Sequence, residues 1–236
     1  MAQKAESKGS GSSVQRAADY LEHLVFDEYE PGDSLPGEGD IAETLQVSRL
    51  TVREAMREIA ARGLVDIHNG RRPVVSSLNG RGVGNFFRSA VRRDSRAALD
   101  LLEIRHALEV QIASLAAQNA SRAQIAQMAE TVEAMADSVG DAESFSREDL
   151  KFHGLLADAT GNRMMALLMQ ELSDALSASR RLSVSGHARR GLTLGPVLEQ
   201  HRAILTAIQA GDQRAARAAM RKHLRATRAD LEAFGV

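Results

Sequence analysis

A change of pattern near residue 94 constrains the fold of this chain most. From Asp94 to the C-terminus, apolar residues recur at helical spacing, and short polar breaks divide the text into segments. Three residues near the segment starts have side chains that suit helix N-caps, namely Asp141, Ser144 and Asp212. The pattern predicts an all-α helical bundle of six helices, over residues 96–119, 122–138, 144–159, 162–182, 194–209 and 213–233.

The N-terminal part follows another pattern. Helical spacing over residues 14–26 ends in a stretch rich in proline and glycine, and two further helices are expected over 39–45 and 48–62. Two short β-prone runs, 64–68 and 73–77, then flank a turn that contains glycine. Three helices followed by a hairpin predict a winged helix-turn-helix. The expected fold class is therefore mainly α, with this domain placed before the helical bundle.

A shift in composition separates the two parts. Residues 78–95 are rich in glycine and arginine, and we interpret them as a linker. It would join a DNA-binding domain at 14–77 to a helical effector-binding and dimerisation domain at 96–236. Residues 1–13 lack the apolar core of a signal peptide and are expected to form a disordered tail.

Composition excludes several classes of protein. The chain has no cysteine, which excludes disulfide scaffolds, thiol chemistry and cysteine-ligated zinc. No apolar run approaches the roughly 20 residues that a membrane span needs, so we expect no membrane association and a cytoplasmic location. A net charge of −1 excludes a uniformly basic coat but allows local basic patches.

Charge is unevenly distributed within the first domain. Residues 14–43 contain nine acidic residues and one arginine, whereas residues 48–72 contain six arginines and three acidic residues. Ser48 can cap the second helix of the helix-turn-helix. The first turns of that helix present three candidates for DNA contact, Arg49, Thr51 and Arg53. Side chains at this position meet base edges in the major groove, where an arginine binds guanine or phosphate.

A solvated helix face is the alternative interpretation of these arginines. In that case Arg49, Arg53 and Arg57 would pair with Glu54 and Glu58 and would have no role in binding. The helix-turn-helix context favours DNA binding over this alternative.

The hairpin tip "HNGRR", residues 68–72, suits a wing that reaches the DNA backbone or the minor groove. Asn69, Gly70 and Arg71 are its candidate contact residues. His68 is expected only to orient the turn.

Residues 35–65, "LPGEGDIAETLQVSRLTVREAMREIAARGLV", together with Gly70, resemble the winged helix-turn-helix of the GntR family of bacterial transcription regulators. The resemblance covers essentially the whole domain. It implies that DNA is contacted at the helix start and in the wing, by Ser48, Arg49, Arg53, Asn69 and Gly70.

Two positions depart from the pattern of that family. Gly39 stands where many members have arginine, and the wing reads "NGRRPVV" instead of "GxGTxV". Arg71 and Arg72 can compensate in the wing. The departures therefore concern the operator sequence and leave the DNA binding itself unaffected.

The segment "EDLKFHGLLADATGN", residues 148–162, combines an apolar helix face with an acidic residue and a histidine. Asp149 and His153 are four residues apart, so they share one face of the helix. They either form a surface hydrogen bond or line an internal polar site. His201 and His223 come from two other predicted helices and can converge on the pair in a bundle. Three imidazoles and a carboxylate suit a divalent cation such as zinc, nickel, manganese or iron.

Residues 97–231 resemble the FCD-type effector domain of the fatty-acid regulator subfamily of GntR proteins. The matching stretches are "DLLEIRHALE" (100–109), "DLKFHGLLADATGN" (149–162), "EQHRAILTAIQAGD" (199–212) and "AMRKHL" (219–224). Metal-binding members use one aspartate and three histidines as ligands. The resemblance places these ligands on Asp149, His153, His201 and His223.

The same resemblance implies a small organic acid held by the metal and by Arg105. An arginine fork matches a carboxylate bidentately, although Arg105 could instead form a surface ion pair with Glu109. Asn162 is either an amide in the effector cavity or the cap of the next helix. His106 and His187 are interpreted as structural or solvated.

We therefore expect a transcription regulator that acts as a repressor. It would bind palindromic operator DNA as a homodimer and be controlled by a small organic acid at the metal site. A metal-dependent enzyme acting on a small carboxylate is the alternative, because three histidines and a carboxylate with open positions also describe a catalytic site. No general base is evident for such an enzyme, and the DNA-binding domain would be unexplained. A third interpretation is an architectural DNA-binding protein whose bundle only dimerises.

Overall fold

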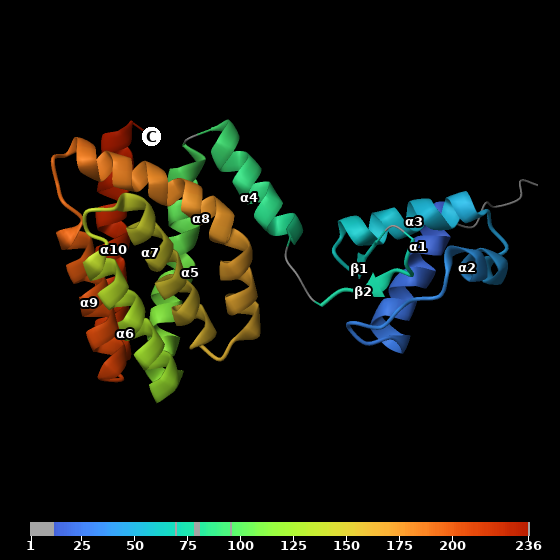
Figure 1. The fold of residues 1–236 in the computed structure, drawn as a ribbon, viewed down its shortest axis with the longest axis horizontal. Helices are drawn as coiled ribbons and strands as arrows, with labels where there is room; N and C mark the ends of the chain where they lie inside the picture. Colours follow the sequence, from blue (N-terminus) through green and yellow to red (C-terminus); the bar gives the residue numbers. More distant parts are fainter. Residues whose placement is uncertain (1–11, 69, 78–80, 95, 236) are drawn as a thin grey trace, which may run out of the picture. The chain divides into compact units, whose positions relative to one another are not determined.

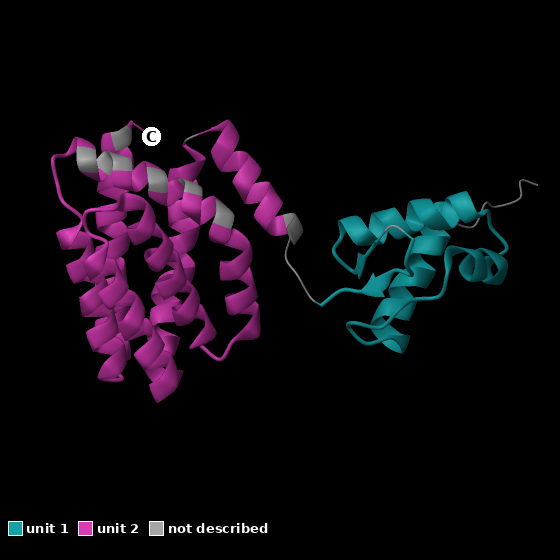
Figure 2. Ribbon diagram, viewed as in Figure 1, with its two compact units in different colours: residues 1–82 teal, residues 83–236 magenta. Residues whose placement is uncertain are grey.

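The computed structural model describes residues 12–68, 70–77, 81–94 and 96–235. It divides the chain into two compact units, Met1–Gly82 and Val83–Val236 (Figure 2). Each unit buries a hydrophobic core of its own. Most of the predicted N-terminal tail lies outside the described residues, but Ser12 caps the first helix by accepting a hydrogen bond from the Gln15 amide.

Unit 1 is a winged helix-turn-helix (Figure 1). Strand β1 pairs antiparallel with β2, and Val65 lies opposite Val75. The predicted order of three helices and a hairpin is confirmed. The elements are α1 (Ser13–His23), a π-helical turn (Leu24–Glu28), α2 (Glu38–Leu45), α3 (Arg49–Ala61), β1 (Val65–Asp66) and β2 (Val74–Val75).

Apolar periodicity orients the second helix of the helix-turn-helix. Val52, Met56 and Ile59 of α3 recur at helical spacing and are fully buried, together with Ile41 of α2. One face of α3 therefore packs into the core, and the opposite face remains exposed. The turn before α3 is tight because Gln46 adopts a left-handed conformation with φ of 53°.

Unit 2 is an all-α bundle. Helix α10 packs against α5, α8 and α9, while α7 packs against α6 and α8. The six helices predicted between residues 96 and 233 are confirmed, although α8 continues seven residues beyond its predicted end. The bundle comprises α4 (Arg81–Arg93), α5 (Ala97–Asn119), α6 (Arg122–Asp137), α7 (Ala142–Asp158), α8 (Arg163–Arg189), α9 (Gly195–Gln209) and α10 (Gln213–Phe234).

The segment interpreted as a linker, residues 78–95, contains helix α4. Phe87 and Val91, four residues apart, pack against the core of unit 2, and this apolar stripe explains why the segment is helical. Helix α4 also approaches α8 closely, since a Cβ atom on Gly84 would collide with the main-chain oxygen of Glu171. Residues 78–80 and 95 lie outside the described residues.

Two of the three predicted N-caps are present. The Asp141 carboxylate accepts from the Glu143 and Ser144 amides at the start of α7, and Asp212 accepts from the Ala215 amide at the start of α10. Ser144 lies inside α7, so its assignment as a cap was wrong. Among the described residues, no helix combines the length and the apolar character needed to cross a bilayer.

Candidate metal centre and DNA-binding surface

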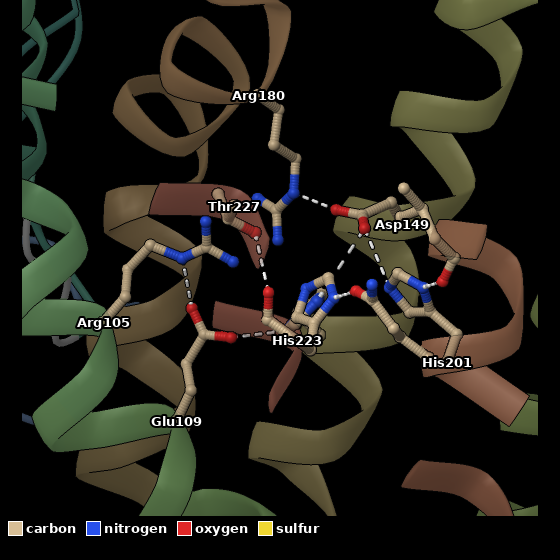
Figure 3. A network of polar contacts seen from close by, with 10 residues as sticks. Arg105, Glu109, Asp149, Arg180, His201, His223 and Thr227 are labelled. Atoms are coloured by element: carbon tan, nitrogen blue, oxygen red, sulfur yellow. Dashed lines mark hydrogen bonds and ion pairs between the residues drawn. The ribbon is translucent and has the colours of Figure 1, made fainter. Parts of the chain in front are cut away.

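One carboxylate and three imidazoles meet inside unit 2. Asp149 and His153 come from α7, His201 from α9 and His223 from α10. Each offers one ligand atom, and these four atoms lie within 4.8 Å of one another. All four side chains are buried, with at most 5% of each residue exposed. The structure thus brings together the four residues that the sequence predicted as metal ligands. Figure 3 labels three of them, Asp149, His201 and His223.

The pattern of α7 explains why its polar pair faces inward. Phe145, Phe152 and Leu156 are buried on the same side of the helix as Asp149 and His153. The four-residue spacing therefore delivers both polar side chains to the core and not to the surface. This arrangement excludes the surface hydrogen bond that was the alternative for this pair.

Hydrogen bonds orient the imidazole rings toward one another. Nδ1 of His201 donates to the main-chain oxygen of Val197 at 2.9 Å, and Nδ1 of His223 donates to Oε1 of Gln200 at the same distance. Nδ1 of His153 lies 2.5 Å from Oε2 of Glu109. His201 and His223 thus each have an acceptor at Nδ1, which leaves Nε2 as the nitrogen with a free lone pair. Nδ1 of His153 faces the Glu109 carboxylate, but this contact lacks hydrogen-bond geometry.

The Nε2 atoms are better placed to bind a metal ion than to form hydrogen bonds within the cluster. Among the described residues, Nε2 of His153 and Nε2 of His201 are buried without a hydrogen-bond partner. Nε2 of His201 lies 2.8 Å from Oδ1 of Asp149, but the pair lacks hydrogen-bond geometry. Two ligands at ~2.1 Å from one ion are at most ~4.2 Å apart, so small shifts would close the cluster on a cation.

The protonation states also suit a metal. Burial is the largest cause that lowers the pKa of His201, to about 3, and the neighbouring His153 lowers it further. Burial and the proximity of His201 lower the pKa of His223 well below its ordinary value. Both rings are therefore neutral at pH 7, which is the form that binds metal ions.

Arg105 forms an ion pair with Glu109 in the core. Its Nε donates to Oε1 of Glu109 at 2.6 Å, and only 1% of each residue is exposed. The pairing was foreseen as an alternative, but its placement on the surface was wrong. Burial alone would raise the pKa of the Glu109 carboxyl, whereas Arg105 and His153 together hold it well below its ordinary value.

Arg180 is a second arginine of the site, and the sequence interpretation missed it. Its Nε contacts Oδ2 of Asp149, and Figure 3 shows its guanidinium group entering the site from α8. The available signal was helical spacing, because Leu172, Leu176 and Arg180 recur every four residues and therefore share the buried face of α8.

A cavity adjoins the cluster. Arg105, Asp149, Arg180 and His223 line it. His187 also lines this cavity, and its Nδ1 lies 3.0 Å from Oδ1 of Asp230 while its Nε2 lies 2.8 Å from the main-chain oxygen of Thr193. His187 is thus structural, in agreement with one of the two roles considered for it.

Asn162 lies apart from this cavity. Its side chain is exposed, and its Oδ1 accepts hydrogen bonds from the Met164 and Met165 amides at the start of α8. The structure supports the helix cap, and the assignment of Asn162 to the effector site is not retained.

Three of the residues predicted to contact DNA, Arg53, Gly70 and Arg71, line the same groove of unit 1. Ser48 caps α3 by accepting a hydrogen bond from the Thr51 amide at 3.0 Å. Arg49 and Arg53 are exposed on the same helix, and Gly70 and Arg71 are exposed in the wing. Asn69 lies outside the described residues. A groove between α3 and the wing is lined by four arginines, Arg53, Arg57, Arg71 and Arg72.

The N-terminus of α2 lies against two of the arginines of α3, Arg49 and Arg53. Arg53 donates from Nε and Nη2 to the carboxylate of Glu38, with distances of 2.9–3.2 Å. A Cβ atom on Gly39 would lie only 3.2 Å from Nη2 of Arg49. The departure at Gly39 from the family pattern therefore leaves space that the Arg49 guanidinium occupies.

We expect Arg49→Ala to weaken operator binding by about 1–3 kcal/mol and to relax the preference at one base pair, if the side chain reads guanine. Fluorescence anisotropy with the operator and its single-base variants measures both effects. Arg16→Ala, which removes an exposed arginine from α1, is the matched control. Equal weakening on every DNA sequence, with a shallower salt dependence, would assign Arg49 to a phosphate instead.

The two units together define a class of protein, a transcription regulator with a winged helix-turn-helix and a helical effector domain. Residues 13–75 match the bacterial regulatory proteins of the gntR family, and residues 100–226 match the FCD domain. The chain belongs to the GntR family of bacterial transcription regulators and carries a C-terminal FCD domain.

Relatives of known name support this assignment over most of the chain. The HTH-type transcriptional regulator LutR of Bacillus subtilis (strain 168) is 31% identical over 198 residues, covering 84% of this chain and 90% of LutR. The HTH-type transcriptional repressor NanR of Citrobacter rodentium (strain ICC168) is 31% identical over 212 residues, covering 88% and 80%. These relatives are transcription regulators and not enzymes.

A solved structure shares the fold. The GntR protein of Streptococcus agalactiae superimposes with a TM-score of 0.68 at 32% sequence identity, over 91% of this chain and 98% of that one.

Proposed function

We propose that this protein is a repressor whose affinity for operator DNA is controlled by a small organic acid, bound beside a divalent metal ion in the FCD domain. The observation that carries the proposal is the buried cluster of Asp149, His153, His201 and His223, next to a cavity into which two arginines extend. Burying these four polar side chains costs free energy, and the DNA-binding unit elsewhere in the chain does not require them.

The cluster would hold the ion through Oδ1 of Asp149 and the Nε2 atoms of the three histidines. When bound, a divalent ion supplies a Lewis-acidic centre with open positions for an anionic ligand. Zinc, nickel, manganese and iron all suit these donors. The chain's own contribution is to orient the rings, because Val197, Gln200 and Glu109 each face an Nδ1 atom.

Arg105 supports an organic acid as the effector. One edge of its guanidinium group is engaged by Glu109, while its Nη2 is buried without a hydrogen-bond partner among the described residues. A carboxylate in the cavity would satisfy this donor with a charge-assisted hydrogen bond. The repressor role rests on the likeness to NanR, which is named a repressor.

We expect a homodimer that binds a palindromic operator. A single winged helix buries too little surface for high specificity, whereas a two-fold pair reads two half-sites together. Sedimentation analysis at micromolar concentration should give the mass of two chains. Footprinting should then show two symmetric half-sites. A monomer that binds non-palindromic DNA would contradict this prediction.

The test of the proposed function is operator binding by the metal-loaded protein with and without a panel of small carboxylic acids. An acid should change the operator affinity by roughly 5- to 150-fold, the range of coupling found between linked sites. The acid must also be recovered chemically unchanged, which separates a regulator from a metalloenzyme. If no acid binds, or if bound acid leaves operator affinity unaltered, the proposed function is wrong.

A further inference from the structure

Three buried guanidinium nitrogens in the cavity lack hydrogen-bond partners among the described residues. They are Nη2 of Arg105 and both Nη1 and Nη2 of Arg180. Arg105 is 1% exposed and Arg180 is 5% exposed, so bulk solvent does not reach these donors. A buried polar group without a partner is costly, and a charged one more so. The donors therefore point to an anionic ligand that reaches both arginines.

The charges around the cavity set the charge of that ligand. Arg105 is compensated by Glu109, and Arg180 is compensated by Asp149. A histidine that binds a metal ion does so as a neutral imidazole, so the three histidines add no charge when the ion is bound. A divalent cation therefore adds two positive charges that no side chain of the site compensates.

Asp230, the other acidic residue of the lining, does not alter this count. Its Oδ1 lies 3.0 Å from Nδ1 of His187 and accepts a hydrogen bond from Nη1 of Arg190 at 2.7 Å. Its charge is thus compensated by its own neighbours. The remaining polar residues of the lining, such as Ser183, Gln200 and Thr227, are uncharged.

Arg105 and Arg180 line the same cavity, so two like charges face the same space. Figure 3 shows the two guanidinium groups extending from α5 and α8 toward the same space. An anion between them would replace this repulsion by two attractions.

We propose that the effector is a small dicarboxylate dianion, with one carboxylate at the metal ion and the other between Arg105 and Arg180. The inference rests on the proposed function, since it specifies the acid that the FCD domain senses. The uncompensated charge lies on the ion, whereas the hydrogen-bond donors without partners lie on Arg105 and Arg180. Two separated carboxylates match this distribution better than one compact anion does.

The free space limits the size of the ligand. The cavity has about 40 Å³ available to the centres of water-sized molecules. Since ~10–15 Å³ of such space holds one water, the cavity has room for about three waters. A diacid of roughly three or four carbons is already larger than three waters, so side chains of the lining would have to shift to admit it, and a longer chain would require larger shifts.

The decisive experiment compares two acids of equal length on the zinc-loaded, full-length protein by isothermal titration calorimetry. Succinate should bind about 10- to 100-fold more tightly than butyrate, because only succinate satisfies the arginine donors with a second carboxylate. Equal affinities would overturn the dianion assignment while leaving an organic-acid effector intact. Binding of neither acid, with no response to other acids, would instead overturn the proposed function.

Arg180→Met provides the matching variant. It keeps an unbranched side chain of similar length but removes the donors, so succinate should lose about 10- to 100-fold in affinity while butyrate changes little. Arg228→Met, which removes an arginine that is 43% exposed, is the control and should alter neither affinity. Arg180→Lys keeps the charge and should retain part of the preference for succinate. Equal weakening of both acids by Arg180→Met would show that Arg180 acts only through Asp149.

Inorganic phosphate separates a dicarboxylate from a compact dianion. Phosphate should bind more weakly than succinate, since it cannot reach the ion and the arginine pair with separate groups. Tighter binding of phosphate than of succinate would overturn the dicarboxylate assignment.

Discussion

His201→Ala and His223→Ala should each lower the affinity for zinc by more than about 100-fold. Loss of a residue that merely orients a ligand typically costs 10- to 100-fold, and loss of a ligand costs more. Both histidines are buried and donate through Nδ1 to a neighbour, so each removal leaves an open position that no other described histidine can fill. The site should therefore lose most of its metal.

Elemental analysis after dialysis against a weak chelator measures this effect. His106→Ala is the matched control, because His106 is exposed on α5 and lies outside the cluster. Wild-type protein and the control should retain about one zinc ion per chain. Equal metal content in all four proteins would refute the metal centre, and the four polar residues would then be only a buried hydrogen-bonding network.

Arg105→Ala should lower the free energy of unfolding of the metal-free protein by about 3–5 kcal/mol. The substitution leaves the carboxylate of Glu109 buried without its guanidinium partner, and breaking a buried ion pair from one side typically has this effect. For a domain whose total stability is of the order of 5–15 kcal/mol, the loss is large. Urea denaturation followed by circular dichroism measures it.

Two variants test the cause of that loss. Arg228→Ala removes an arginine that contacts Glu103 at 3.0 Å on the surface, and it should change stability by less than about 1 kcal/mol. The double variant Arg105→Met with Glu109→Gln removes both charges and should recover much of the loss. If Arg105→Ala is as mild as Arg228→Ala, the ion pair contributes little to the fold. The same result would make Arg105→Ala usable for testing effector binding directly.

Helical periodicity was enough to predict most of the fold. The positions of α5 to α10 follow from apolar spacing and from polar breaks, and Asp141 and Asp212 mark two of the helix starts. Spacing also placed Asp149 and His153 on one helix face, but it left a surface pair as an alternative. The assignment of all four residues as candidate metal ligands came from the resemblance to the FCD-type domain.

The remaining parts depend on contacts between helices. Helix α4 was interpreted as linker because its glycine and arginine content outweighed a stripe of few apolar residues. Arg180 and the inward placement of Glu109 were missed, since charged residues are normally expected on the surface. Only the packing of α5, α7 and α8 shows that each of these charges meets an opposite charge in the core.

The packing of α8 has a mechanical consequence. This single helix bears Arg180 and also the main-chain oxygen of Glu171 against which Gly84 of α4 is seated. The two positions are nine residues apart, a distance of roughly 13 Å along the helix axis. A helix is stiff along its axis, so a tilt at one end also moves the other. An anion that draws Arg180 inward would therefore also displace Glu171, whose main-chain oxygen contacts Gly84 of α4. Helix α4 directly follows the DNA-binding unit in the chain. A shift of α8 on ligand binding would therefore displace α4 and, through it, the chain segment that leads to the DNA-binding unit.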